Sequence, residues 1–494
     1  MLSLGLHLFA LDQRPFHSDE AIHAKLSYQF AYMGEYRYDP TYHGPFLYYL
    51  VALVYWIFGD SDFTARLPAA LSGVSMLLVC WKISSIFGNK AAWWTGLLFT
   101  ISPLYLYYGR FLRMDILEVL TASLAFLSLY EAVWLKKERA WITVGIWSAL
   151  AFATKENAYI TAVLAISTAI VILLNLGWRK SLHSFYTWLQ TSWHGPLTAF
   201  SLWIIFSLAL YTVFFRYPQD WIFPYKAIIH WAEQHNIERV GGPWWYHLFR
   251  LAQYEFLILI TATIWVFRQS SLKILDFSLY FFGCASLAMY AYLGEKVPWL
   301  GIHQVWAFMP LAGAQMARTL GLEGCWWSRT LAGIGIAVTL IISLAANFSP
   351  NLRSPQPQRT ESLYYSDTTV ELQSVAREIV DKEKSASGMP PVASVQGIAT
   401  WPLTWYWRHE SIYWSLPKEG SLPDLVLVDI DKRDLMDQLL GSKYSLESIP
   451  VRAWWFPEND MPTVADLFHY LITREPWTPV TFNEALVLRR KPGE

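Results

Sequence analysis

Long apolar stretches limit what this chain can fold into. Several windows of 18 or more residues carry few or no charges, and each is long enough to cross a bilayer as a helix. The clearest windows are 91–109, 114–135, 157–176, 196–215, 249–267, 275–293 and 329–348, with weaker ones near 66–87, 140–154 and 300–318. A mean hydropathy of +0.25 and 54% apolar residues agree with this reading. The sequence therefore predicts a polytopic membrane protein.

Charge and cysteine content exclude several classes of protein. A net charge of -1 argues against a nucleic-acid partner. The sequence has no Gly-rich phosphate loop that ends in Gly-Lys-Ser/Thr, so we expect no ATP-driven pump domain in this chain. Cys80, Cys284 and Cys325 lie in or beside apolar helices, which favours apolar packing over a disulfide framework.

Short loops predict the orientation in the membrane. If the first helix runs outward, the inner connections hold eleven cations and three acids. These are Lys82, Lys90, Lys136, Lys137, Arg139, Arg179, Lys180, Arg268, Lys273, Arg318 and Arg329, with Glu138, Asp276 and Glu323. The positive-inside rule then gives about 11 spans and an outer C-terminal part. Residues 1–11 are apolar but about half as long as a span needs, so we expect an incomplete first helix.

In this frame a group of charged residues falls at the outer ends of helices. Charges gather at interfaces or line polar cavities because they cost several kcal/mol inside hydrocarbon. A shared polar cavity explains the group best, and exposed loop charges are the alternative. The group consists of Asp19, Glu20, Arg110, Arg113, Asp115, Lys155, Glu156 and Lys296.

Two further elements are expected outside the bilayer core. Ser18 is a good N-cap, which puts Asp19 in the first turn of a helix that lies in the interface plane. Residues 45–58 are apolar but must not cross if Lys82 is inside, so they predict a second in-plane helix.

The C-terminal part reads as a separate domain. Polar, Pro-rich residues form a linker over 350–360, which follows an all-α transmembrane domain over 1–349. In residues 361–494, apolar runs at 425–430 and 485–488 predict buried strands, and patterns near 367–384 and 461–473 predict helices. This indicates a small extracytoplasmic α/β domain.

The charged group suits sugar transfer from a lipid phosphate. The acceptor hydroxyl needs a general base, a role for Asp19. The leaving phosphate is a stable anion, so it needs cations rather than an acid, a role for Arg110, Arg113, Lys155 and Lys296. Asp115 is a second carboxylate that would hold a divalent metal cation or orient the base.

Each residue also has a simpler interpretation. Asp19 could serve only as an acid at a helix start. Glu20 could bind metal or acceptor, or simply be solvated, and His43 could be a packing histidine. Arg110 and Arg113 could be aqueous-edge cations. Lys155 and Glu156 could form a self-paired couple at the surface.

The order of motifs resembles the GT-C glycosyltransferases that use polyprenyl-linked sugars. The branch is that of protein O-mannosyltransferases and the aminoarabinose transferase of lipid A. The full motif sequences are most similar to those of a prokaryotic family described as flippase-activity-associated in archaeal N-glycosylation. The matching pieces are Asp19-Glu20, His43-Gly44-Pro45-Phe46-Leu47-Tyr48-Tyr49, Ala65-Arg66-Leu67-Pro68, Arg113-Met114-Asp115, Ala153-Thr154-Lys155 and Gly294-Glu295-Lys296-Val297-Pro298-Trp299.

The resemblance implies inverting glycosyl transfer on the outer face of the cytoplasmic membrane. Asp19, with Glu20 beside it, stands in the place of the catalytic carboxylate, Asp115 in that of a second-loop acid, and Lys296 in that of a cation near the lipid phosphate. His43 stands where the family often has Lys or Asp before Pro-Pro, which is a departure at a carrier contact. The implied partners are a polyprenyl-phosphate-linked sugar and an acceptor protein, lipid or glycan.

Two rival functions use the same features differently. A transporter or flippase for lipid-linked glycans would need polar groups along the whole crossing, whereas here they gather at one end. A membrane scaffold with an outer binding domain would tolerate loss of the outer-loop acids.

Overall fold

The computed structural model describes residues 1–175, 192–235, 242–321, 324–352, 361–385, 393–460 and 462–492. The chain forms two compact units. The first comprises Met1–Leu11 and Phe30–Asn347, and the second comprises Asp12–Gln29 and Phe348–Glu494. The domain boundaries expected at 349 and 361 stay a prediction, and residues 353–360 of the expected linker lie outside the described residues.

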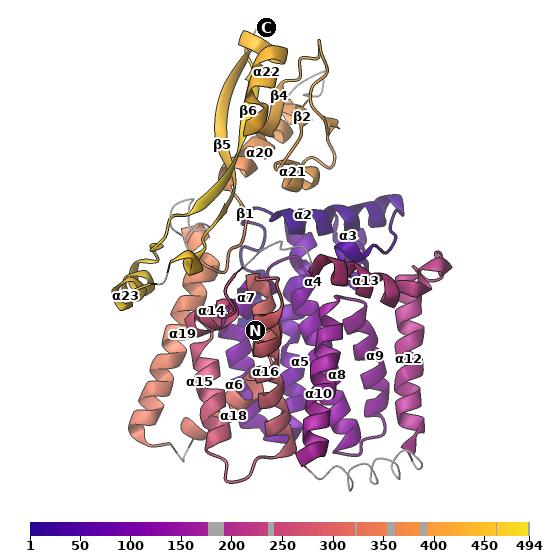
Figure 1. Ribbon diagram of the computed structural model, residues 1–494, viewed down its shortest axis with the longest axis vertical. Helices are drawn as coiled ribbons and strands as arrows, with labels where there is room; N and C mark the ends of the chain where they lie inside the picture. Colours follow the sequence, from indigo (N-terminus) through magenta and orange to yellow (C-terminus); the bar gives the residue numbers. More distant parts are fainter. Residues whose placement is uncertain are drawn as a thin grey trace. The chain divides into compact units, whose positions relative to one another are not determined.

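The first unit is helical (Figure 1). Its α-helices are α1 (Leu2–Leu8), α3 (Phe46–Phe58), α4 (Asp62–Ser75), α5 (Leu77–Phe87), α6 (Asn89–Ile101), α7 (Pro103–Gly109), α8 (Asp115–Val133), α9 (Ala140–Phe152), α10 (Asn157–Asn175), α12 (His194–Tyr211), α13 (Phe223–His235), α14 (Tyr246–Tyr254), α15 (Phe256–Phe267), α16 (Ile274–Tyr292), α17 (Gly301–Val305), α18 (Met309–Thr319) and α19 (Trp326–Leu352). Short turns are η2 (Pro40–Tyr42), η3 (Pro218–Ile222) and η4 (Pro298–Leu300), and η1 (Gln29–Met33) is a π-helical turn between the units. Helix α9 packs against α8 and α12, and α18 packs against α6 and α15.

The helices confirm a multi-pass membrane protein but not the expected number of spans. Among the described residues six helices are long and apolar enough to cross, or seven if α14 and α15, bent by 94°, form one span. These six are 62–87, which combines α4 and α5, and α8, α10, α12, α16 and the part of α19 up to Phe348. Helices α3 and α9 are apolar but shorter. The count of about 11 spans is therefore not confirmed.

The window 91–109 is not one continuous helix as expected. It breaks at Ser102, which has an extended backbone and caps α7 by accepting a hydrogen bond from Tyr105 N. Pro103 explains the break, because proline disfavours the helical conformation in the residue before it and has no N–H to donate. Glu255 supports the new helix start, since its carboxylate accepts hydrogen bonds from Ser102 Oγ at 2.6 Å and Leu104 N at 3.0 Å.

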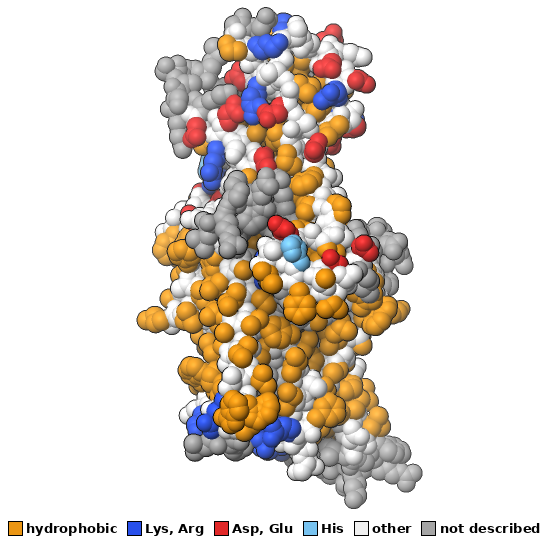
Figure 2. Space-filling model, turned by 90° about the vertical axis from the view of Figure 1, so that its left-hand side faces the viewer, with side chains coloured by type: hydrophobic (Ala, Val, Ile, Leu, Met, Phe, Trp, Pro, Cys, Tyr) orange, Lys and Arg blue, Asp and Glu red, His pale blue; other side chains and the backbone are white. Residues whose placement is uncertain are grey.

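Cations expected on the inner side gather at helix connections. Glu131, near the end of α8, lies 2.5 Å from Lys82 Nζ and 2.8 Å from Lys137 Nζ. Figure 2 shows Lys and Arg side chains at the lower end of the first unit, where Figure 1 places the α15–α16 connection. Arg179, Lys180 and Glu323 lie outside the described residues. Which side of the membrane this end faces stays a prediction.

The second unit contains the α/β arrangement expected for the C-terminal part. Its strands are β1 (Asp367–Thr368), β2 (Ala393–Val395), β3 (Ile412–Tyr413), β4 (Leu425–Asp429), β5 (Tyr444–Trp454) and β6 (Thr481–Arg490). They form one sheet in the order β1-β5-β6-β4-β2-β3, in which β2 is parallel to both of its neighbours and the other pairs are antiparallel. Its helices are α2 (Ser18–Tyr28), α20 (Val370–Ser385), α21 (Thr400–Tyr406), α22 (Arg433–Leu440) and α23 (Val464–Thr473).

Helices cover both faces of this sheet. Leu425 and Leu427 of β4 share a core with residues of α20 and α21, whereas the alternating Val426 and Val428 share one with Met436 of α22. A strand buried on both faces reads as a continuous apolar run. This explains why 425–430 was recognisable from the sequence.

The close approach of α18 to α6 generates a first prediction. A Cβ added at Gly313 would lie 2.7 Å from Thr95 N and 2.8 Å from Ala91 O, and such backbone atoms cannot move aside cheaply. We expect Gly313→Ala to destabilise the protein by roughly 1–3 kcal/mol because the added methyl overpacks the core. Its apparent thermal unfolding midpoint in detergent should fall.

Gly333→Ala is the matched control. Gly333 lies in α19, and a Cβ there meets nothing within 4 Å. Its midpoint should stay close to that of the wild type, and an equal fall for both variants would contradict the packing account.

Candidate functional site

The acidic pair lies at the start of α2, in the second unit. The N-cap is His17 rather than the predicted Ser18. His17 Nδ1 accepts a hydrogen bond from Asp19 N at 3.0 Å, and Glu20 Oε2 accepts one from His17 N at 3.1 Å. With Nδ1 accepting, Nε2–H donates to Tyr365 O at 2.8 Å. The imidazole, fixed at both nitrogens, takes the capping position one residue earlier than a serine would.

Glu20 stabilises the start of α2 through its side chain. Its side chain is fully buried, and its carboxylate also pairs with Arg14 Nη2 at 2.9 Å. Arg14 in turn lies 3.6 Å from the carboxylate of Asp367, at the edge of the sheet. The interpretation of Glu20 as a solvated surface acid is therefore wrong.

Asp19 is the accessible member of the pair. Its side chain is 34% exposed, and Oδ1 lies 3.9 Å from His17 Nδ1. A carboxylate with access to solvent at a helix N-terminus can accept a proton from an incoming hydroxyl. The two neighbouring acids thus differ sharply in surroundings.

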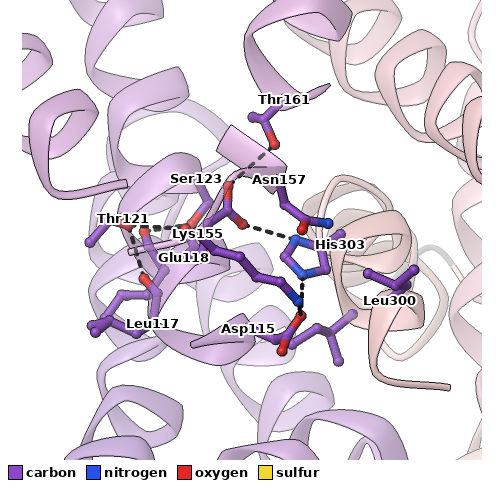
Figure 3. Close-up of polar contacts among 12 residues, drawn as sticks. Asp115, Leu117, Glu118, Thr121, Ser123, Lys155, Asn157, Thr161, Leu300 and His303 are labelled. Atoms are coloured by element: carbon purple, nitrogen blue, oxygen red, sulfur yellow. Dashed lines mark hydrogen bonds and ion pairs between the residues drawn. The ribbon is translucent and has the colours of Figure 1, made fainter. Parts of the chain in front are cut away.

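A second charged group lies in the first unit and centres on Asp115 (Figure 3). Asp115 stands in the first turn of α8 and is almost fully buried. Oδ1 accepts hydrogen bonds from Lys155 Nζ at 2.5 Å and from His303 Nε2 at 2.9 Å. Oδ2 accepts one from Arg113 Nε at 3.2 Å. Lys155 comes from the turn between α9 and α10 and His303 from α17, so Asp115 links three parts of the helical unit.

His303 joins a second buried carboxylate to this group. Its Nδ1 lies 2.9 Å from Glu118 Oε2, one turn further along α8. A neutral imidazole donates from only one nitrogen, so contact with a carboxylate at both nitrogens favours the doubly protonated ring. With a doubly protonated ring, His303 joins Arg113 and Lys155 as a third cation beside two carboxylates, and the net positive charge of that state favours an anionic ligand nearby.

Arg113 is held on its other side by an aromatic ring. Its guanidinium carbon lies 4.0 Å from the centroid of Trp299. This cation–π contact restricts the guanidinium to a plane and limits its motion. Arg113 is therefore a positioned cation rather than one that reaches freely into water.

His43 and Glu156 form a separate pair. Their Nδ1 and Oε2 atoms are 2.7 Å apart, and the His43 ring stacks on Trp231 with centroids 5.3 Å apart. Gly44 N also donates to Thr154 O at 3.1 Å, so the loop before α3 is fastened to the turn that carries Lys155. The idea that Lys155 and Glu156 pair with each other at the surface is therefore wrong.

Arg110 fastens the N-terminal segment of the first unit. Its guanidinium donates to the carbonyl oxygens of Leu6 at 2.7 Å, Phe9 at 2.6 Å and Ala10 at 3.1 Å. These carbonyls belong to the end of α1 and the residues after it, which need donors once buried. Arg110 is nine-tenths buried, so it is not an aqueous-edge cation.

Lys296 caps the end of α16. Its ammonium donates to Tyr290 O at 2.9 Å, Ala291 O at 2.7 Å and Leu293 O at 2.6 Å. A lysine has three donors, so all three are used here. Burial lowers the pKa of Lys296. Contact with a phosphate would require the ammonium to release at least one carbonyl.

Glu118 and His303 were not recognised from the sequence. Glu118 lies inside an apolar window, three residues after Asp115, and an ionisable residue in a span should prompt a search for its partner. His303 lies in one of the weaker windows, seven residues after Lys296. Only the packing of α17 against α8 brings the two together.

A divalent cation at Asp115 does not fit the side chains around it. Among the described residues, no group of three or more His, Cys, Asp or Glu side chains is arranged to hold a metal ion. The Asp115 carboxylate already pairs with Lys155 and Arg113, and these cations would repel a metal. We therefore derive no step through a metal at this position.

The predicted site residues fall in both units. Asp19 and Glu20 belong to the second, and Arg110, Arg113, Asp115, Lys155, Lys296 and His43 belong to the first. Within the first unit the structure joins Arg113, Asp115 and Lys155 directly, whereas Arg110, Lys296 and His43 have partners of their own. That all of them line one cavity with Asp19 stays a prediction.

Comparison with known proteins gives one partial sequence match. A family described as dolichyl-phosphate-mannose-protein mannosyltransferase matches residues 42–211, about a third of the chain. This segment contains His43, Arg113, Asp115 and Lys155. No curated protein sequence matches the chain.

Solved structures match over nearly the whole length. ArnT from Cupriavidus metallidurans bound to undecaprenyl phosphate has a TM-score of 0.65 at 15% identity, with 98% of this chain and 96% of that chain covered. The apo oligosaccharyltransferase of Archaeoglobus fulgidus has a TM-score of 0.53 at 12% identity, with 87% and 68% covered. A complex of the same protein with Zn and sulfate has a TM-score of 0.52 at 13% identity, with 90% and 70% covered.

At these identities the structural matches show the fold. The chain therefore has the same fold as ArnT and the archaeal oligosaccharyltransferase, and its residues 42–211 match the mannosyltransferase family.

Proposed function

We propose that this protein is an inverting glycosyltransferase that moves one sugar from a polyprenyl-phosphate carrier to an acceptor on the outer face of the cytoplasmic membrane. The observation that carries the proposal is the contrast between Asp19 and Glu20. Glu20 is buried and paired with Arg14, whereas Asp19 keeps a partly exposed carboxylate. The fold shared with a structure bound to undecaprenyl phosphate supports a lipid-linked donor.

In the proposed reaction Asp19 acts as general base. It takes the proton of the acceptor hydroxyl as the hydroxyl oxygen attacks the anomeric carbon from the face opposite the phosphate. The bond between that carbon and the phosphate oxygen breaks, and its electron pair leaves with the polyprenyl phosphate. The acceptor gains the sugar with inverted configuration.

Arg113 and Lys155 are the proposed contacts for the carrier phosphate. Both are cations held in place by Asp115, and phosphate contacts of this type are strong in surroundings with little water. Asp115, Glu118 and His303 act through them as positioning residues. Arg110, Lys296 and His43 brace the helix ends and loops around the site.

Neighbouring acids provide a matched test of the base. Asp19→Asn removes the proton acceptor, so we expect the turnover of a lipid-linked sugar to fall by about 10²–10⁴-fold. The thermal unfolding midpoint should change little, because Asp19 is partly exposed.

Glu20→Gln makes the same change of charge one residue later. It removes a buried partner of Arg14, so we expect the unfolding midpoint to fall. Turnover is measured on the purified variants with a polyprenyl-phosphate sugar as donor, and the thermal unfolding midpoint is measured on the same preparations. Undiminished turnover in Asp19→Asn would disprove the mechanism, and lipid flipping without transfer would favour the transporter.

A second test separates carrier binding from folding. Lys155→Met leaves the buried Asp115 carboxylate with one cation fewer, which should cost roughly 3–5 kcal/mol of stability and raise the KM for the lipid donor. The double variant Asp115→Asn with Lys155→Met removes both charges of the pair.

In the double variant stability should partly recover, by a coupling of about 1–3 kcal/mol. The KM should stay high, because the cation for the phosphate is still absent. A KM restored to the wild-type value would show that Lys155 does not contact the carrier.

A further inference from the structure

Helix α23 of the second unit exposes a row of large apolar side chains. Val464 is 71% exposed, Phe468 63% and Ile472 80%. The three are spaced four residues apart, so they follow one side of the helix over two turns. Exposed apolar rows of this size on a folded helix mark a surface that contacts protein or lipid.

The helix is nevertheless firmly built into its unit. Thr463 and Asp466 form a capping box at its start. On the opposite side Tyr470 is buried, with its ring centroid 5.0 Å from Trp455 and 5.4 Å from Trp477. The exposed row is therefore a fixed surface of the unit and not the result of a loose helix.

Chain connectivity limits how far α23 can lie from the bilayer. Tyr470 Oη donates to Glu361 Oε2 at 3.1 Å, and Arg474 Nε lies 3.6 Å from Glu361 Oε1. Glu361 follows Leu352, the end of helix α19, by nine residues, and the candidate span within α19 ends at Phe348. Nine residues reach at most about 30 Å when fully extended. The row is thus tethered within reach of the membrane surface.

We propose that α23 lies in the plane of the membrane, with Val464, Phe468 and Ile472 inserted at the boundary between headgroups and acyl chains. A straight row without a charge suits a flat apolar medium. The ionisable groups beside the row have partners of their own, since Asp466 caps the helix and His469 pairs with Glu475 at 3.0 Å. We take lipid as the partner of this surface because the chain connects α23 to a candidate membrane span.

The docking has a consequence for the acidic pair. Helix α2, which carries Asp19, belongs to the same compact unit as α23. Docking of α23 on lipid would limit how far the unit that carries Asp19 can move from the membrane surface, where the phosphate of a lipid-linked donor lies. This consequence rests on the proposed function, whereas the docking itself does not.

A depth measurement on the full chain tests the proposal. In a background with Cys80, Cys284 and Cys325 replaced by alanine, Phe468→Cys or Ile472→Cys is labelled with an environment-sensitive fluorophore. The protein is reconstituted in phosphatidylcholine vesicles that contain lipids with nitroxide groups in the acyl chains. Thr473→Cys is the matched control, because this exposed residue lies about 140° round the helix from Phe468 at 3.6 residues per turn.

Fluorophores at 468 and 472 should be quenched several-fold more strongly by the nitroxide lipids than the one at 473. They should also be protected from aqueous iodide. Equal quenching by iodide at all three positions would overturn the proposal, as would protection that appears only when an acceptor protein is added. This measurement does not depend on activity. If Asp19→Asn disproved the glycosyltransferase mechanism, the evidence for membrane docking would be unaffected.

Discussion

A carboxylate buried among apolar helices is stable only if cations surround it, and Asp115 is the point where this protein meets that requirement. Lys155, Arg113 and His303 converge on its two oxygens from a loop, a helix connection and a short helix. Glu118 adds a second acid and receives the other side of His303. Removal of any one partner leaves a buried charge without full compensation. The segments that carry these residues therefore stabilise one another in the folded state.

Buried polar groups of the backbone also need partners, and this explains the positions of the other predicted cations. Arg110 and Lys296 each satisfy backbone carbonyls at helix ends, which have no donor of their own. A basic residue at an outer helix end can therefore serve the fold as well as a ligand. Arg113 and Lys155 differ because they pair with a carboxylate and, in Arg113, with an aromatic face. This difference is why the proposed carrier contact rests on these two.

The acidic pair shows a division of roles between adjacent residues. Glu20 completes the capping box of α2 and pairs with Arg14, while Asp19 remains accessible. The segment before α2 is also part of the C-terminal unit, since Phe16 packs on Trp405 and its N–H donates to Tyr406 Oη at 2.8 Å. The candidate base is therefore carried by the α/β unit, although it is close in sequence to the first helix.

The sequence by itself determined the membrane class, most of the apolar helices, the buried strand at 425–429 and the two acids at the start of α2. These follow from composition and periodicity, which are local properties. The tertiary structure alone decided that His17, whose ring donates to the distant Tyr365 O, caps α2, and that Glu118 and His303 join Asp115. Partners 188 residues apart, such as His303 and Asp115, meet only through helix packing, and no local pattern encodes such a contact.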